Sequence, residues 1–200
     1  MRVFRTGGAG CKGGHTLLRR LRDRQEALVF GNFSNSAPEA LGRVKQLANA
    51  DFDVVQGDIQ DGTALEQAMA EFRPEAVVHF AGLKAVGESN MQPLEYYAQN
   101  VFGSIALLRA MEACDCNRIV FSSSATVYGE AQYLPYDEDH PLQPTNPYGR
   151  TQHFIQEIIR DWARARPQAS AAPLRYHNPV GADASGQSGE DPNGLPTNPL

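Results

Sequence analysis

The chain has 200 residues, of which 42% are hydrophobic and 20% charged, and its formal net charge is −5. This composition provides enough apolar side chains for a folded core and excludes a disordered chain. A mildly acidic chain without a basic run argues against nucleic acid or an anionic membrane surface as partner, and a mean hydropathy of −0.42 without a long apolar stretch excludes a transmembrane helix.

Short apolar runs rich in Val, Ile and Phe alternate with longer amphipathic segments along the chain. Strands are predicted at 2–4, 27–30, 52–55, 76–80, 118–121 and 172–176, and helices at 14–24, 37–48, 62–71, 94–113 and 148–166. Such alternation is typical of right-handed βαβ units. We therefore predict an α/β fold with a Rossmann-like, doubly wound parallel sheet.

A glycine-rich turn follows the first predicted strand. Gly7, Gly10 and Gly13 have the spacing G-x-x-G-x-x-G, and the turn leads into a helix expected to begin near Gly14. Glycines allow the backbone to approach a pyrophosphate closely, and a helix N-terminus provides N–H groups and a favourable dipole. The position between strand and helix predicts a dinucleotide site rather than a plain turn.

Two nearby residues do not fit a dinucleotide site. Such sites usually carry an acid at the end of the second strand to bind the adenosine ribose, and Gly31 occupies that position. Arg5 lies in a strand that should be buried on both faces, where an unpaired charge is costly. His79, at the end of the fourth strand, is predicted to be a hydrogen-bonded structural histidine rather than a ligand.

A cluster of three serines, ending at Ser124, is expected to follow the fifth strand at the carboxyl edge of the sheet, where open α/β folds bind ligands. These serines could bind a substrate hydroxyl or serve only as a turn or helix cap. Tyr148 and Gln152 then share one face of a helix. A lysine four residues after a tyrosine would favour the phenolate, and Gln152 is neutral.

The C-terminal part of the chain differs in composition. Ten of the 13 prolines follow residue 134, and residues 178–200 show no periodicity. We predict a dinucleotide-binding domain at 1–177 and, at 178–200, only the beginning of a smaller, truncated substrate domain. The three cysteines, an odd number, and a charged N-terminus unlike a signal peptide predict a cytoplasmic protein without a zinc site.

Three stretches are more specific than a dinucleotide motif: 79–89 (HFAGLKAVGES), 121–129 (FSSSATVYG) and 174–181 (LRYHNPVG), continued by 189–194 (GEDPNG). Through them almost the whole chain resembles the NAD-dependent epimerase/dehydratase family of extended short-chain dehydrogenases/reductases, in the branch that interconverts UDP-glucose and UDP-galactose. The resemblance implies that tightly bound NAD takes a hydride from C4 of a UDP-hexose. The 4-keto sugar then turns over and receives the hydride back on its other face.

The resemblance also implies roles for individual residues. Tyr148 would take the 4-hydroxyl proton, and Ser124 would hold that hydroxyl in line. The pyrophosphate would lie against Gly7, Gly10 and Gly13, and the adenosine against Asn32, Asn35, Ser36, Asp58 and Ile59. The nicotinamide half would contact Phe80, Ala81 and Lys84, and the nucleotide-sugar would contact Asn178. Helices near 94–113 and 148–166 would form a homodimer face.

The chain departs from this family at several positions. The catalytic Lys is replaced by Gln152, the ribose-binding Asp by Gly31, an apolar residue by Arg5, Tyr-Ile by Cys11-Lys12, Asn by Gln99 and Phe by His177. With most of the sugar-binding domain absent, these changes predict an epimerase with impaired activity. The alternative is a non-catalytic remnant that binds a nucleotide or nucleotide-sugar, or pairs with an intact epimerase. Another reductase or dehydratase is disfavoured by the runs at 121–129 and 79–89, and a dehydratase also because no acid directly follows Ser124.

Overall fold

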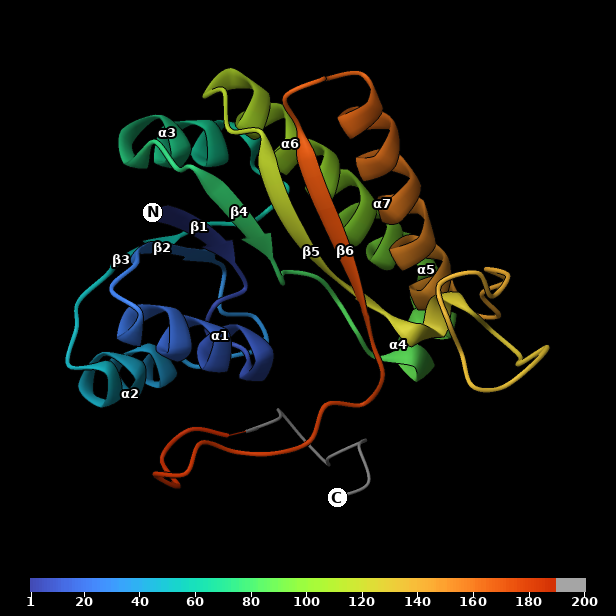
Figure 1. The fold of residues 1–200 in the computed structure, drawn as a ribbon, viewed down its shortest axis with the longest axis horizontal. Coiled ribbons are helices and arrows are strands. Elements are labelled where there is room, and N and C mark those ends of the chain that lie inside the picture. The colour runs from blue at the N-terminus through green and yellow to red at the C-terminus, as the bar shows by residue number, and fades with distance from the viewer. Residues whose placement is uncertain (190–200) are drawn as a thin grey trace.

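The computed structural model describes residues 1–189 and contains one six-stranded sheet in the order β3-β2-β1-β4-β5-β6, with every neighbouring pair parallel (Figure 1). The strands are β1 (Arg2–Thr6), β2 (Glu26–Gly31), β3 (Asp53–Gln56), β4 (Ala76–His79), β5 (Arg118–Ser124) and β6 (Ser170–Tyr176). The strand order reverses between β1 and β4, which is the point where doubly wound sheets bind ligands. The predicted Rossmann-like fold is confirmed.

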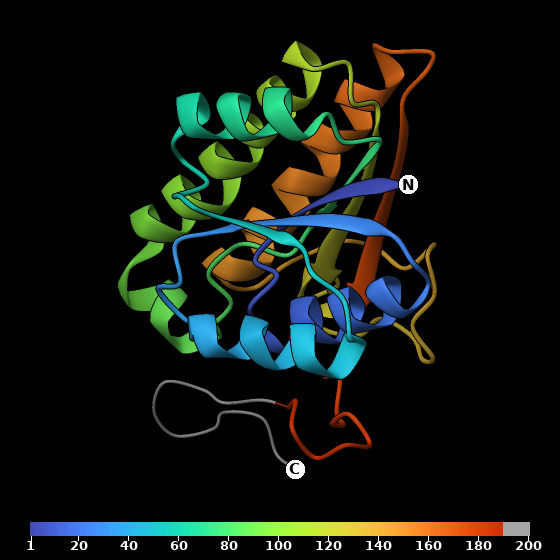
Figure 2. The same ribbon diagram turned by 90° about the vertical axis from the view of Figure 1, so that its left-hand side faces the viewer.

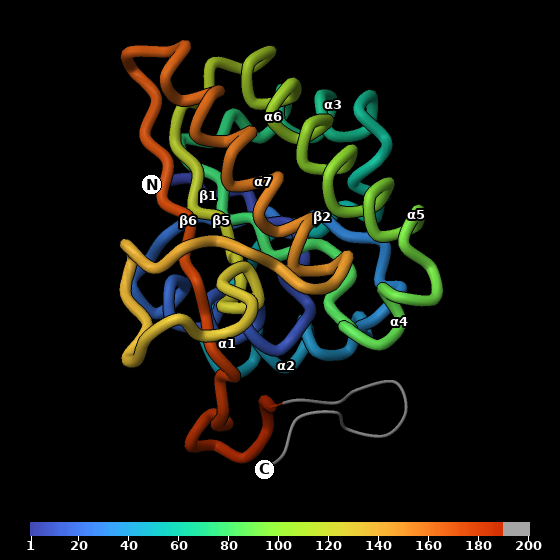
Figure 3. The backbone as a smooth tube through the Cα atoms, turned by 90° about the vertical axis from the view of Figure 1, so that its right-hand side faces the viewer, coloured from blue at the N-terminus to red at the C-terminus, as the bar shows by residue number. Residues whose placement is uncertain are grey.

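Helices cover the two faces of the sheet unequally. They are α1 (Cys11–Arg22), α2 (Pro38–Ala48), α3 (Gly62–Phe72), α4 (Val86–Met91), α5 (Pro93–Tyr96), α6 (Gly103–Ala113) and α7 (Pro147–Arg164). Figure 2 shows α1 and α2 on one face and α3, α6 and α7 on the other. Viewed from the opposite side, α6 and α7 run side by side along the strands (Figure 3).

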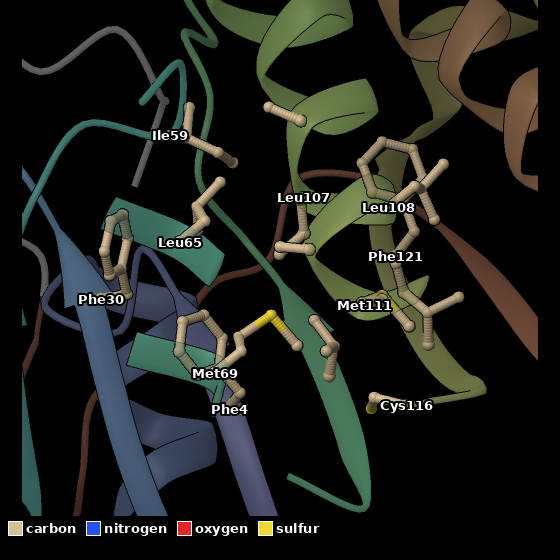
Figure 4. Packing of buried hydrophobic residues seen from close by; sticks show 14 of the residues in the cluster. Phe4, Phe30, Ile59, Leu65, Met69, Leu107, Leu108, Met111, Cys116 and Phe121 are labelled. Atoms are coloured by element: carbon tan, nitrogen blue, oxygen red, sulfur yellow. The ribbon is translucent and has the colours of Figure 1, made fainter. Parts of the chain in front are cut away.

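The larger core lies under α3, α6 and α7 (Figure 4). Phe4, Val77 and Phe121 project from alternate positions of β1, β4 and β5 into this core, and each is at most 2% exposed. A smaller cluster packs α1 and α2 against Ala27 and Val29 of β2. Strands β1 and β2 are therefore buried on both faces. The apolar run of β2 is typical of such a strand, whereas β1 also buries Arg5 and Thr6.

The structure corrects four local predictions. Helix α1 begins at Cys11 rather than near Gly14, and the serines are the last residues of β5 rather than a loop after it. The helix predicted at 94–113 is divided into α5, a π-helical turn (Tyr97–Phe102) and α6, with Pro93 at the first turn. Helix α4 was not predicted, because its short polar sequence has no apolar periodicity.

Residues 178–189 form no helix or strand, in agreement with their composition, and the rest of the 178–200 segment lies outside the described residues. Among the described residues, no helix has both the length and the apolar character needed to cross a bilayer.

Candidate active site

The glycine-rich turn joins β1 to α1 at the carboxyl edge of the sheet. Gly7 has a φ of +68°, and a Cβ atom there would lie 2.7 Å from the backbone nitrogen of Ala81. A Cβ at Gly13 would clash with the Gly7 carbonyl, whereas the nearest atom to a Cβ at Gly10 is 3.6 Å away. Gly7 and Gly13 are therefore required by local packing. Gly10, the N-cap of α1, leaves space for a group that approaches the helix N-terminus.

At the ends of β2 and β3, polar groups surround Gly31. The Asn32 side chain donates a hydrogen bond of 2.7 Å to the Asp58 carboxylate, which also accepts from the backbone of Gln60 at 2.9 Å and from Gln99 at 3.4 Å. A Cβ at Gly31 would have its nearest neighbour, Gly7 N, at 4.0 Å. Position 31, where dinucleotide sites usually have an acid, therefore carries no side chain, and an aspartate would fit there.

The other predicted adenosine residues differ in their surroundings. Asn35 is exposed and Ser36 half-buried, in the turn before α2. The side chain of Ile59 is only 4% exposed and belongs to the large core, where it lies against Gly103 (Figure 4). Any contact between Ile59 and an adenine ring would therefore have to use its backbone atoms.

The segment after β4 crosses the end of β1. The backbone of Phe80 donates to the Thr6 carbonyl at 3.1 Å, and that of Ala81 donates to the Thr6 hydroxyl oxygen at 3.2 Å. Lys84 follows in an exposed position. These bonds hold the segment 80–84 beside the glycine-rich turn.

Two buried polar residues that the sequence analysis did not identify fix this segment. Asn100 accepts a hydrogen bond from the Leu83 backbone at 2.7 Å and donates to the Leu83 carbonyl and to the Thr151 hydroxyl. The Tyr96 hydroxyl accepts a hydrogen bond from the Ala85 backbone at 3.0 Å and donates its one proton to the Glu88 carboxylate at 2.7 Å, with Ala85 O at 2.8 Å as the alternative acceptor. The signal available in the sequence was a polar residue on the otherwise apolar inner face of a helix.

Tyr148 and Ser124 form the centre of the site. Tyr148 is in the first turn of α7 and 8% exposed, and its ring packs edge-on against Tyr96 with centroids 6.4 Å apart. Burial raises the pKa of Tyr148, and a hydrogen bond with the Ser124 side chain opposes that rise. Ser124 also accepts from the Thr126 backbone at 3.2 Å, so it is a helix cap as well as the partner of Tyr148.

Gln152 lies one turn after Tyr148, as the spacing predicts, and is 5% exposed. Its side-chain oxygen is buried and has no hydrogen-bond partner within residues 1–189. A buried, unsatisfied acceptor is uncommon in folded proteins and points toward a donor on a bound group. Arg150, on another face of α7, is exposed.

A lysine in the glycine-rich turn connects it to the end of β6. The ammonium of Lys12 is 5.0 Å from the centre of the Tyr176 ring, and Tyr176 pairs with Ser124 in the β5–β6 register. Burial lowers the pKa of Lys12, and the charge of Lys84 lowers it further. The turn, the two lysines and Ser124 therefore lie at one edge of the sheet. Asn178 follows β6 in an exposed segment.

This arrangement can support chemistry on a hydroxyl group. The helix N-terminus and the lysines suit phosphate groups, and the tyrosine hydroxyl paired with a serine suits proton transfer. No carboxylate directly follows Ser124 to serve as a second acid or base.

Comparison with known proteins finds one family and several UDP-glucose 4-epimerases that are similar to this chain. The family described as "NAD dependent epimerase/dehydratase family" matches residues 3–197. The chain is 49% identical to UDP-glucose 4-epimerases from Bacillus subtilis over 198 residues and from Mus musculus over 204 residues, covering 99% and 98% of this chain. The crystal structure of the Bifidobacterium longum UDP-glucose 4-epimerase with NAD+ and UDP superposes with a TM-score of 0.96 at 43% identity, covering 99% of this chain.

The chain covers only part of each of these proteins. It spans 58% of the Bacillus subtilis protein, 59% of the mouse protein and 59% of the Bifidobacterium longum chain. Every element of the site described above lies within the matched part.

Proposed function

Because the chain belongs to the NAD dependent epimerase/dehydratase family, we propose that it binds NAD and interconverts UDP-glucose and UDP-galactose through a 4-keto intermediate, at a reduced rate. The observation that carries this proposal is the buried Tyr148 in the first turn of α7, whose pKa is influenced by the Ser124 side chain at the end of β5. The pair lies at the same sheet edge as the glycine-rich turn, with a neutral residue in the position of the catalytic lysine.

The residues present fit a dinucleotide in two places. The open space at Gly10 and the N-terminus of α1 suit a pyrophosphate. The unpartnered oxygen of Gln152 suits a hydroxyl donor such as that of the nicotinamide ribose. At Gly31 the fit is poorer, because this position has no acceptor for the adenosine ribose.

The chain's own groups would hold and move a proton. When bound, NAD supplies a hydride acceptor for the sugar C4 and later returns the hydride. Tyr148 as phenolate takes the 4-hydroxyl proton, and Ser124 orients that hydroxyl toward it. Epimerisation requires the sugar to turn over between the two hydride transfers, so both groups must act on either face of C4.

The low rate follows from the charge state of Tyr148. Its burial raises the pKa of the phenol, and Gln152 supplies no charge to lower it. A lysine about 5 Å away at an effective dielectric near 20 would favour the phenolate by about 3 kcal/mol, roughly two pKa units. At neutral pH the chain therefore holds much less phenolate than it would with a lysine at this position.

The substitution Gln152→Lys tests this proposal. We expect UDP-galactose turnover at neutral pH to rise by about 100-fold, and the alkaline break of the pH–rate profile to move down by about two units. Glu157→Lys, which adds a lysine at an exposed position of the same helix, is the matched control and should change neither. An unchanged pH–rate profile in Gln152→Lys would contradict the role of Tyr148 as the group that takes the 4-hydroxyl proton.

The substitution Gly31→Asp tests the cofactor site. The carboxylate has room and would accept ribose hydroxyls, so we expect the Kd for NAD, measured by calorimetry, to fall by about tenfold or more. Gly42→Asp, at an exposed glycine with no neighbour within 4 Å, is the matched control. Equal NAD affinity in both variants would mean that the ribose does not lie at Gly31.

A second candidate function is a binding module without catalysis. The presence of Gln152 and Gly31 favours it. These residues stand where the family has a catalytic lysine and a ribose-binding aspartate, on which turnover depends, and neither residue disturbs the fold. This candidate predicts that NAD and UDP bind while UDP-galactose stays unconverted even in Gln152→Lys.

The proposed assembly is a homodimer through α6 and α7, in the cytoplasm. Phe102, in the turn before α6, and Phe154, in α7, are 51% and 45% exposed, which supports an apolar contact there. The three cysteines are free thiols. Sedimentation should give a dimer that Phe154→Asp dissociates. A monomer in the parent chain would contradict this assembly.

A further inference from the structure

The glycine-rich turn contributes a charged side chain to the candidate site as well as its backbone. Lys12 is the second residue of α1 and lies between Gly10 and Gly13. Its side chain is half-buried, and its ammonium lies 5.0 Å from the centre of the Tyr176 ring. The family pattern has isoleucine at this position, so the charge is a departure of this chain from that pattern.

The surroundings of Lys12 are cationic rather than acidic. Burial lowers the pKa of Lys12, the charge of Lys84 lowers it further, and Cys11 opposes both effects. No carboxylate within residues 1–189 contributes to the pKa of Lys12. A half-buried ammonium usually has an anionic partner, and the face of the Tyr176 ring compensates its charge only in part. The environment of Lys12 therefore favours an anion from a bound molecule.

The direction of the Lys12 side chain indicates which half of a dinucleotide it would meet. The residues predicted to contact adenosine follow β2 and β3, on one side of β1 in the sheet. Tyr176 is the last residue of β6 on the other side of β1, and it pairs in register with Ser124 of β5. Lys12 starts from the turn after β1 and reaches toward Tyr176. Its ammonium therefore lies toward the nicotinamide half of the site.

We propose that Lys12 binds the cofactor's pyrophosphate, at the phosphate on the nicotinamide side. This role rests on the proposed function, because its ligand is NAD. An ammonium is a compact charge with three donors that binds phosphate oxygens, and the N-terminus of α1 at Gly10 offers N–H groups to the same anion. The contact adds affinity through a phosphate, whereas Gly31 adds none through the adenosine ribose.

Calorimetric binding of ADP and AMP to the full chain tests this role without any turnover. ADP has a second phosphate on the side where nicotinamide would continue, and AMP lacks it. We expect Lys12→Gln to raise the Kd for ADP by about tenfold or more at low salt, less at high salt, and to leave the Kd for AMP unchanged. Lys12→Arg retains the charge and should restore most of the affinity for ADP.

Lys45→Gln is the matched control. Lys45, in the last turn of α2, is also half-buried, and its ammonium lies 4.9 Å from the centre of the Phe52 ring. Its substitution therefore removes an ammonium from an aromatic face away from the site, and should change neither Kd. Tm of both variants, measured without nucleotide, reports the loss of the ring contact. A lysine that only packs against its ring would lower Tm and leave the Kd for ADP unchanged.

The possible outcomes separate this role from the proposed function. An unchanged Kd for ADP in Lys12→Gln overturns the role and leaves Lys12 as a structural contact of Tyr176. An equal loss of AMP affinity overturns the assignment to the nicotinamide side. Weaker binding of UDP with unchanged binding of ADP also overturns it, in favour of the diphosphate of the substrate.

Two further outcomes concern the parent chain. If it binds neither ADP nor NAD, both the proposed function and the role of Lys12 are wrong. If it binds ADP in a manner that depends on Lys12 and does not convert UDP-galactose, the role of Lys12 is supported and only the proposed epimerase activity fails.

Discussion

Two basic side chains are buried on opposite faces of the same part of the sheet. His79 of β4 pairs in register with Thr6, one residue after Arg5 of β1, so the two basic side chains belong to neighbouring strands. His79 is 1% exposed and Arg5 is 0% exposed. The ring nitrogens of His79 lie 2.7 Å from the Thr6 hydroxyl and 2.9 Å from that of Ser104, whereas Arg5 has no partner.

The difference comes from what covers each face. Ser104 belongs to α6, which packs over the face that carries His79. On the other face, α1 contributes Arg20, a second cation, toward Arg5. Burial of a polar group is tolerated where the covering helix has a complementary side chain, and costs free energy where it does not.

The largest expected difference in stability between the two faces comes from substituting apolar residues of β5. Phe121 is 2% exposed in the core under α3, α6 and α7, while Val120 is half-buried on the opposite face. Phe121→Ala should lower the free energy of unfolding by about 3–5 kcal/mol, and Val120→Ala by about 1 kcal/mol or less. Urea denaturation followed by circular dichroism measures both. Equal losses would mean that the second face is covered as completely as the first.

The pKa of His79 predicts a pH dependence of folding stability that is comparable in size to the effect of Phe121→Ala. Burial lowers this pKa from 6.5 to about 4, so between these values the unfolded chain binds a proton that the folded chain does not. Stability is therefore fully present above pH 6.5 and falls as the pH drops to about 4, by about 3 kcal/mol in total.

His79→Gln, which retains hydrogen-bonding groups without titrating, should remove most of this dependence. Denaturation midpoints at pH 7 and pH 4.5 measure it in both chains, and His15→Gln at a partly exposed histidine is the control. An equal acid sensitivity in His79→Gln would assign the titration to other groups.

The same contrast explains how much of the molecule could be predicted from sequence. Apolar periodicity and the βαβ alternation predicted all six strands and the sheet type, because they reflect backbone geometry and burial. The structural role of His79 was predicted correctly, as was the unfavourable burial of Arg5. What could not be predicted was the partner of His79 on α6, because Ser104 lies 25 residues after His79 and only the fold brings them together.

The candidate site shows the same limit. The spacing of Tyr148 and Gln152 placed both side chains on one helix face, because that depends only on helix geometry. The contacts of Asn100 with Leu83 and Thr151 join three separate segments, and no short-range sequence pattern predicts them.

The smallest expected effect concerns Arg5 itself and has the opposite sign from the others. Arg5→Val removes a buried cation without a partner and adds an apolar side chain, so in chloride buffer it should raise the free energy of unfolding by about 1–3 kcal/mol. Arg19→Ala removes the same charge from a side chain that is 76% exposed and should change stability by less than about 0.5 kcal/mol. Urea denaturation of the three chains measures the effect. Destabilisation by Arg5→Val would show that the guanidinium has a compensating partner in the folded protein, and the contrast between the two faces would then disappear.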